Sequence, residues 1–205
     1  MALRRINIIL AFLFCTVLVV TGCKQQTSAQ TSSVQSIGQA YPALSSDLDE
    51  ALNQSLDAFE ATLADENMGG LVEFMPPRIV ETMSTQNRVT KAQLIAQLDS
   101  TWAQTAALVK INQFEITRDG TKIELASSGR PYKILPTQVD MQILTTDTNA
   151  VAESETLAFL ENGKWYVVRL DEPQMVAMFE TAYPDLNEVE IMKPSMKIDG
   201  KLVQP

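Results

Sequence analysis

Apolar residues recur at helical spacing over the first part of the chain that follows residue 46. The first stripe advances by four, four, three and four positions, which places it on one side of about four helical turns. Its members are Leu48, Leu52, Leu56, Phe59 and Leu63. Ser46 and the acidic residues after it suit a helix start, and Asn67 to Gly70 suits its end. The pattern predicts a helix that buries one face.

Two shorter helical segments and a third full helix are predicted next. Residues 71–75 form a short turn, and Pro76-Pro77 restarts the chain into a helix that reaches about Met83. Thr90 is a capping residue for a further helix that ends near Leu108. One side of that helix is apolar and carries Leu94, Ile95, Leu98 and Trp102.

From residue 108 the period changes to two, which indicates strands. Residues 108–117 and 122–127 flank Asp119-Gly120, a tight-turn signal that predicts a hairpin. A strand over 137–144 follows, and turn residues 146–149 join it to the next strand.

A second hairpin is predicted near the end of the strand region. Residues 151–160 and 164–170 flank Glu161-Asn162-Gly163. Residues 175–183 suit a last helix, and the end at Pro205 is expected to be loose. Short loops favour sequential antiparallel pairing, so the fold class is α+β, with N-terminal helices on a curved meander sheet.

The segment Asn162 to Val168, read with this order of elements, resembles the nuclear-transport-factor-2-like superfamily. The resemblance covers about Asp47 to Leu170. It implies a bent sheet around a helix layer, shaped as a cone with an internal pocket. The superfamily contains enzymes, binding modules and assembly domains, so the fold does not fix the function.

The N-terminus has the pattern of an export signal. Arg4 and Arg5 precede an apolar run from Ile6 to Val20. Fifteen helical residues reach about 22 Å, less than the ~30 Å hydrocarbon core of a bilayer. This favours a secretory signal over a membrane-spanning helix.

Val20-Thr21-Gly22-Cys23 resembles the lipobox of bacterial lipoproteins. The resemblance implies cleavage between Gly22 and Cys23 and attachment of acyl chains to Cys23. Cys15 lies inside the apolar run and is lost with the signal, so the mature protein has no disulfide. Lys24 follows the cysteine, and the absence of Asp there implies an outer-membrane destination if the cell has that membrane.

These features divide the chain into a signal peptide (1–22), a lipidated cysteine with its tether (23–46), and one α+β domain with a loose tail (47–205). Gln, Ser and Thr fill 13 of the positions 24–46. Such a segment is a flexible spacer of about 25–30 Å. From Asp47 onward, 13 basic side chains face 25 acidic ones, a net charge of -12. This charge disfavours nucleic acid as a partner.

The sequence contains no histidine, which excludes an imidazole base and any His-containing metal site. No cofactor-binding or metal-binding motif is present. Asp140 alternates with Val139 and Met141, so it faces solvent if they face the core. On a sheet curved around a pocket, Asp140 instead points inward, beside Tyr132 or Trp102, as an acid/base pair of ketosteroid-isomerase type would require.

Two functions stay open. The first is a lipid-anchored envelope protein whose acidic domain, without catalysis, binds an envelope protein or a small ligand. The second is an envelope enzyme that uses Asp140 and Tyr132. A ligand pocket, if present, is expected to include Trp102, Tyr132, Asp140 and Trp165. The helical spacing of Trp102 favours a core position over a ligand contact.

Overall fold

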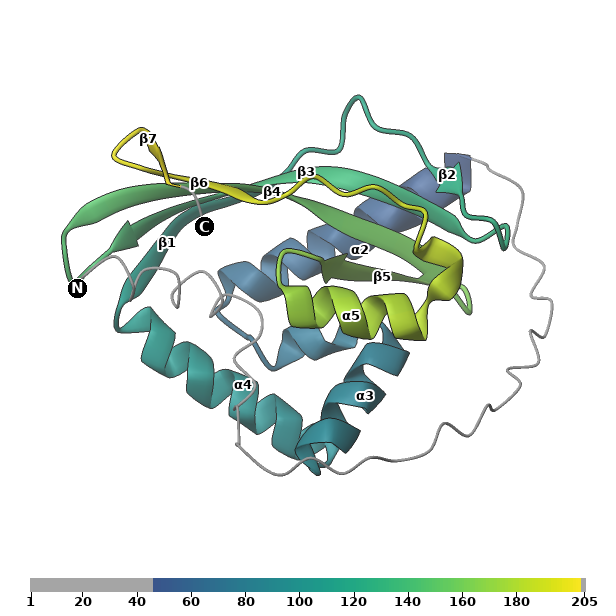
Figure 1. Cartoon of the computed structure of the whole chain (residues 1–205), viewed down its shortest axis with the longest axis horizontal. Helices are drawn as coiled ribbons and strands as arrows, with labels where there is room; N and C mark the ends of the chain where they lie inside the picture. The colour runs from purple at the N-terminus through teal and green to yellow at the C-terminus, as the bar shows by residue number, and fades with distance from the viewer. Residues whose placement is uncertain (1–45, 204–205) are drawn as a thin grey trace.

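The computed structural model describes residues 46–203, so Gly22, Cys23 and the predicted signal and tether lie outside the described residues. Within this range the chain forms helices first, then strands with one further helix (Figure 1). The α-helices are α2 (Ser46–Ala64), α3 (Pro77–Asn87), α4 (Lys91–Ala106) and α5 (Pro173–Ala182), and the short 3-10 helices are η1 (Gly70–Glu73) and η2 (Pro184–Leu186).

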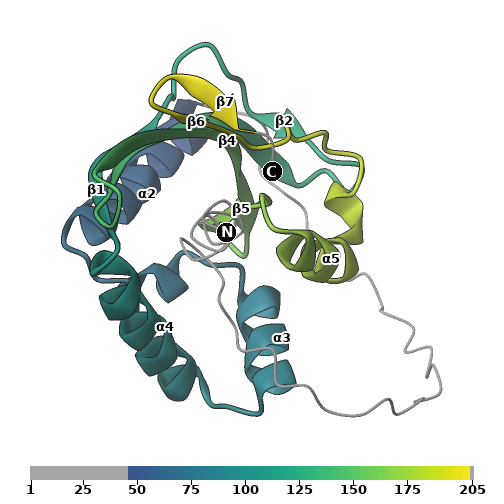
Figure 2. The same cartoon turned by 60° about the vertical axis from the view of Figure 1, so that its left-hand side comes forward.

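All seven described strands belong to one antiparallel sheet in the order β1-β3-β4-β6-β7. β2 also pairs with β3, and β5 with β4. The strands are β1 (Val109–Ile116), β2 (Glu124–Leu125), β3 (Pro131–Ile143), β4 (Thr148–Glu161), β5 (Lys164–Arg169), β6 (Ser195–Ile198) and β7 (Lys201–Val203). Figure 2 shows the sheet arching over α3 and α4, with β1 at its edge. The α+β class and the curved antiparallel sheet are confirmed.

The helix starts and turns follow local chemistry. Thr90 caps α4 as predicted, because its Oγ1 accepts a hydrogen bond from the Gln93 backbone at 3.2 Å and the Gln93 side chain accepts one from the Thr90 backbone at 2.9 Å. The predicted turn between β4 and β5 is present. Asn162 and Gly163 both have positive φ, at 52° and 76°, as a tight hairpin requires.

The long strand β4 is covered on both faces near its end. Ala158 and Leu160 pack against the apolar stripe of α2, together with Trp165 and Val167 of β5. Phe159, which points to the other face, contacts α5, with ring centroids 5.9 Å from Phe179. The strand sits between two helical layers, which explains its continuous apolar run.

A third apolar cluster lies on the α2 side of the sheet toward its other end. Its buried members are at most 6% exposed, and they all come from strands. They are Val109, Val139, Met141, Ile143, Ala150, Ala152 and Met196. The alternation over residues 137–144 therefore reflects one buried face of β3, because Val139 and Met141 are core residues.

The predicted hairpin across Asp119-Gly120 is wrong. β1 and β2 do not pair with each other; both pair with β3, β1 along Thr137–Ile143 and β2 at Pro131–Tyr132. Gly120 has a positive φ of 80°, so the turn chemistry is real. β3 is 13 residues long, and its edge accommodates both strands in succession.

The C-terminal region contains two strands that the sequence analysis does not predict, while the Pro205 end, expected to be loose, lies outside the described residues. β6 pairs with Ala150–Glu153 of β4, and β7 folds back on β6 across Asp199-Gly200. Both turn residues have positive φ. These strands extend the sheet beside β4 at the end that β5 leaves unpaired.

Candidate functional site

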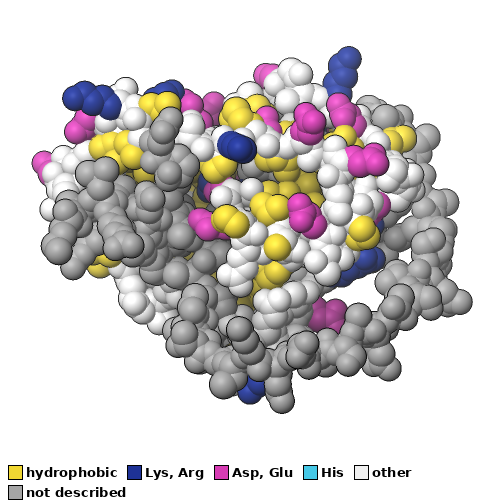
Figure 3. Space-filling view, viewed as in Figure 1, with side chains coloured by type: hydrophobic (Ala, Val, Ile, Leu, Met, Phe, Trp, Pro, Cys, Tyr) yellow, Lys and Arg dark blue, Asp and Glu magenta, His cyan; other side chains and the backbone are white. Residues whose placement is uncertain are grey.

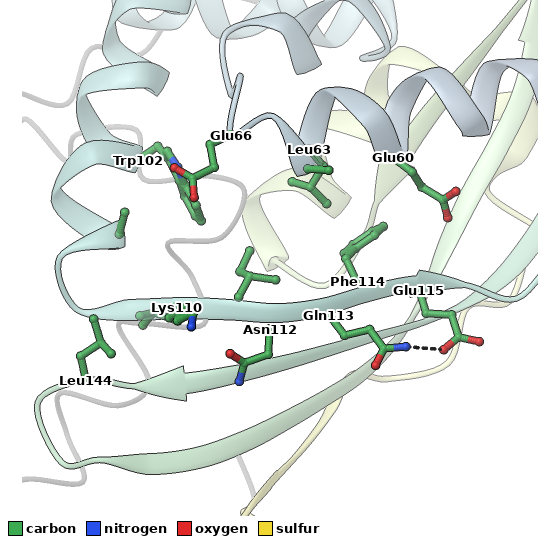
Figure 4. Close-up of a pocket in the computed structure, with 14 residues that line it drawn as sticks. Glu60, Leu63, Glu66, Trp102, Lys110, Asn112, Gln113, Phe114, Glu115 and Leu144 are labelled. Carbon is green, nitrogen blue, oxygen red and sulfur yellow. Dashed lines mark hydrogen bonds between the residues drawn. The ribbon is translucent and has the colours of Figure 1, made fainter.

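An open groove of 730 Å³ runs along β1, the edge strand of the sheet (Figure 4). Its far wall is the last part of α2, the Glu66 turn and one side of α4. The described lining residues are Glu60, Leu63, Ala64, Glu66, Trp102, Ala106, Val109, Lys110, Ile111, Asn112, Gln113, Phe114, Glu115 and Leu144. Every residue from 109 to 115 takes part. Because successive side chains of a strand point to opposite faces, the groove follows the edge of β1 and not one face of it.

The edge of β1 presents unpaired backbone groups to the groove. In an antiparallel pair, residues that are hydrogen-bonded to the neighbour alternate with residues whose N–H and C=O point away. Leu144 donates to the Leu108 carbonyl at 2.8 Å, and Thr117 donates to the Pro136 carbonyl at 2.8 Å. These two bonded pairs fix which residues of β1 are hydrogen-bonded to β3. The backbone groups of the alternate residues point away from β3, toward the groove.

The residues whose backbone N–H and C=O groups point away from β3 are Val109, Ile111, Phe114 and Ile116. The pattern changes parity at Asn112 because a β-bulge lies between Ile111 and Gln113. Within residues 46–203, no hydrogen bond outside the sheet uses the backbone of these four residues. The strand therefore has an open edge on both sides of the bulge.

The wall of the groove that faces the helices is apolar. Leu63 of α2 is buried, and the Phe114 ring packs near Phe59, with centroids 6.0 Å apart. Trp102 of α4 is half-buried beside Glu66 (Figure 4). The indole Nε1 of Trp102 is shielded from solvent and has no hydrogen-bond partner.

The groove carries an excess of acidic groups. Three of its described lining residues are acidic and Lys110 is basic. Glu60 is held by an ion pair with Arg118 of the β1–β2 connection. No ion pair among the described residues uses Glu66 or Glu115, and Glu115 accepts a hydrogen bond from Gln113 at 3.2 Å. These two carboxylates, which have no ion pair among the described residues, favour an occupant with positive charge.

The structure does not bring the four predicted pocket residues together. Trp102 lines the groove, whereas Trp165 is 2% exposed in the core beneath α2. Tyr132 and Asp140 both lie on β3, eight residues apart, which corresponds to about 26 Å along a strand. No described side-chain contact links them.

Each member of the predicted acid/base pair has a different local partner. The Tyr132 hydroxyl donates to Glu124 Oε2 of β2 at 2.6 Å. This hydrogen bond to a carboxylate, with partial burial, raises the pKa of Tyr132 to about 12. The Asp140 side chain is on the other face of β3 from Val139 and Met141, and it accepts a hydrogen bond from Gln138 at 3.0 Å.

A buried charged cluster is a feature that sequence reasoning missed. Arg130 immediately precedes β3 and is 5% exposed. Its Nε lies 2.8 Å from Asp185 Oδ2. Glu161, which is 4% exposed, lies 3.7 Å from Arg130 and 3.3 Å from Arg78, and it accepts a hydrogen bond from the Tyr183 hydroxyl at 3.0 Å. The members are separated by up to 107 positions in the chain, so no local sequence motif predicts that they meet.

The contacts of this cluster fit a structural role. Burial on its own would raise the pKa of Asp185, but hydrogen bonds from Arg130 and Ser128 hold that pKa below its ordinary value. The Arg130 guanidinium also lies over the ring of Tyr183, 5.4 Å from its centroid. The cluster ties α3, the end of β4 and the segment after α5 to one another.

Metal and membrane features are absent from the described part of the chain. Over residues 46–203, no group of three or more Cys, Asp or Glu side chains is arranged to hold a metal ion. The helices of the same range are all too short or too polar to cross a bilayer.

Comparison with known proteins returns no relative. No protein-family model, curated protein or solved structure matches this chain. The similarity to the nuclear-transport-factor-2-like superfamily and the lipobox therefore stay predictions.

Proposed function

We propose that this protein is a lipid-anchored envelope lipoprotein whose domain is a non-enzymatic binding module, with the groove beside β1 as its binding site. The observation that carries the proposal is the combination of an open strand edge and an apolar wall in one groove. A strand edge of this kind binds other chains unless it is covered.

The dimensions of the groove favour a protein partner over a small ligand. Seven residues of β1 line it, which corresponds to a length of about 20 Å. It is open to solvent along this length, whereas small-molecule sites enclose most of the ligand. The groove is therefore suited to a segment of another protein in the envelope.

The proposed anchor leaves the groove accessible. The tether would enter the domain at Ser46, the start of α2, while the groove begins at Glu60, toward the other end of that helix. These two positions are about 21 Å apart along the helix axis. Figure 3 shows acidic side chains over the face of the domain that it displays, with no dense basic patch among the described residues. This charge favours a protein partner over an anionic lipid surface.

Position-specific photocrosslinking in intact cells tests the proposal. Gln113 is exposed in the groove, and Gln174 is exposed on α5, away from it. A photoreactive amino acid at position 113 is expected to give a recurrent protein adduct of one defined mass. The same amino acid at position 174 is the matched control and is expected to give none.

Two results would count against the proposal. Equal adducts from both positions would show random collision, and no adduct from position 113 in folded, membrane-bound protein would show an empty groove.

A further inference from the structure

We infer that the occupant of the groove is an extended polypeptide segment of a partner protein that pairs with β1 as an additional antiparallel strand, with aliphatic side chains toward the helices and basic side chains on the opposite face. This inference rests on the proposed function, because it names the partner class of the same site.

The backbone of β1 sets the pairing. The N–H and C=O groups of Ile111 and Phe114 point into the groove on the two sides of the bulge. An added antiparallel strand bonds through residues that lie directly opposite these two. Main-chain hydrogen bonds of this kind give affinity without requiring a fixed sequence, and the side chains then supply selectivity.

The side chains of β1 decide which residues the added strand needs. Ile111 and Phe114 face the helices, where Phe114 meets Phe59. Directly opposite residues of an antiparallel pair share one face, so the residues bonded to Ile111 and Phe114 also point to this apolar wall. Aliphatic residues are thus required at alternate positions of the partner segment.

The intervening residues of the segment point to the other face of the sheet. There Glu115 has no cation partner among the described residues. A Lys or Arg side chain on the added strand gains from this carboxylate and from the acidic surface of the domain, whereas Glu or Asp is repelled. Lys110 at the other end of the groove limits this preference to the half near Glu115.

The space in the groove favours a single strand over a second copy of the domain. Antiparallel pairing of two β1 edges relates the copies by a two-fold axis perpendicular to the sheet, so the helices of both copies lie on one face. The end of α2 and one side of α4 already form the far wall of the groove. The helices of a second copy would have to occupy the same region.

The bulge does not prevent one strand from pairing along the whole of β1. β3 already pairs with 109–111 and with 113–116, with one residue fewer than β1 across the bulge, and an added strand can do the same. A partner segment of about six residues is therefore sufficient to face the seven β1 residues that line the groove.

Binding of synthetic hexapeptides to the purified protein, measured by calorimetry, tests the inference. The probe is acetyl-KVKIKV-amide, and the charge control is acetyl-EVEIEV-amide. Two further peptides are N-methylated derivatives of the probe and isomers of each other. One carries backbone N-methyl groups on the three aliphatic residues, and the other carries them on the three lysines. Aliphatic N-methylation removes the N–H groups that face β1, and lysine N-methylation removes those that face away.

The expected result is binding of the basic probe, with affinity at least about tenfold lower for the aliphatic-methylated isomer and for the acidic peptide. The lysine-methylated isomer is expected to bind within about threefold of the probe, since it keeps the pairing hydrogen bonds. Any other order of affinity between the two methylated isomers, or absence of binding by the basic probe, would overturn the inferred pairing.

The outcome is separable from that of the proposed function. A crosslink at position 113 in cells, together with failure of the peptides, would retain the groove as a binding site and reject strand addition. A protein that sediments as a dimer and binds no peptide would reject it in favour of a second copy.

Discussion

Replacement of Arg130 by alanine is expected to lower the free energy of unfolding by about 3–5 kcal/mol. The reason is that Asp185 loses its one ion pair among the described residues and Glu161 loses one of two, because Glu161 keeps Arg78 at 3.3 Å. The Asp185 side chain is 19% exposed, so water replaces the lost cation only in part. The alanine also removes the guanidinium from the ring of Tyr183. Urea-induced unfolding of the purified protein measures the change.

The matched control is Lys197→Ala. Lys197 lies 2.7 Å from Glu153, closer than Arg130 lies to Asp185, but both side chains of this pair are about 40% exposed. A surface pair contributes less than about 1 kcal/mol. Equal destabilisation by the two substitutions would contradict the account of the cluster, because burial would then have no role.

Replacement of Cys23 by serine is expected to abolish incorporation of labelled palmitate and to remove the protein from the outer-membrane fraction. Serine has no sulfur for the thioether, and two or more acyl chains are needed for lasting attachment. None of the helices between residues 46 and 203 supplies a spanning segment in their place. Labelling followed by membrane fractionation measures both effects.

Cys15→Ser is the control for this substitution, because Cys15 lies in the apolar run before the predicted cleavage site. It is expected to leave labelling unchanged. Palmitate on the Cys23→Ser protein, or loss of label in the Cys15→Ser protein, would show that the lipobox interpretation is wrong.

Features set by neighbouring residues could be predicted from the sequence. The stripe from Leu48 to Leu63 gives α2, because helical spacing alone brings those side chains to one face. Thr90 and Asn162-Gly163 also have the predicted roles, since a cap and a tight turn depend on two to four adjacent residues.

Features set by contacts between distant residues could not be predicted. Asp119-Gly120 gives a turn, but only the length of β3 explains why its flanking strands do not pair with each other. Arg130 meets Asp185 and Glu161 through the fold. The groove is a tertiary feature of the same kind. Trp102 is among the residues predicted for a pocket, although its helical spacing favours the core, and the structure packs it against the core cluster of α2 while it also lines the groove beside β1.

Amide hydrogen exchange along β1 in the purified protein tests the central claim, that this strand has an open edge, most directly. The account predicts fast exchange at Ile111 and Phe114, whose N–H groups point into the groove, and slow exchange at Lys110 and Glu115, whose N–H groups are bonded to β3. Slow exchange at all four amides would show that the edge is already covered, and would contradict its assignment as a binding site.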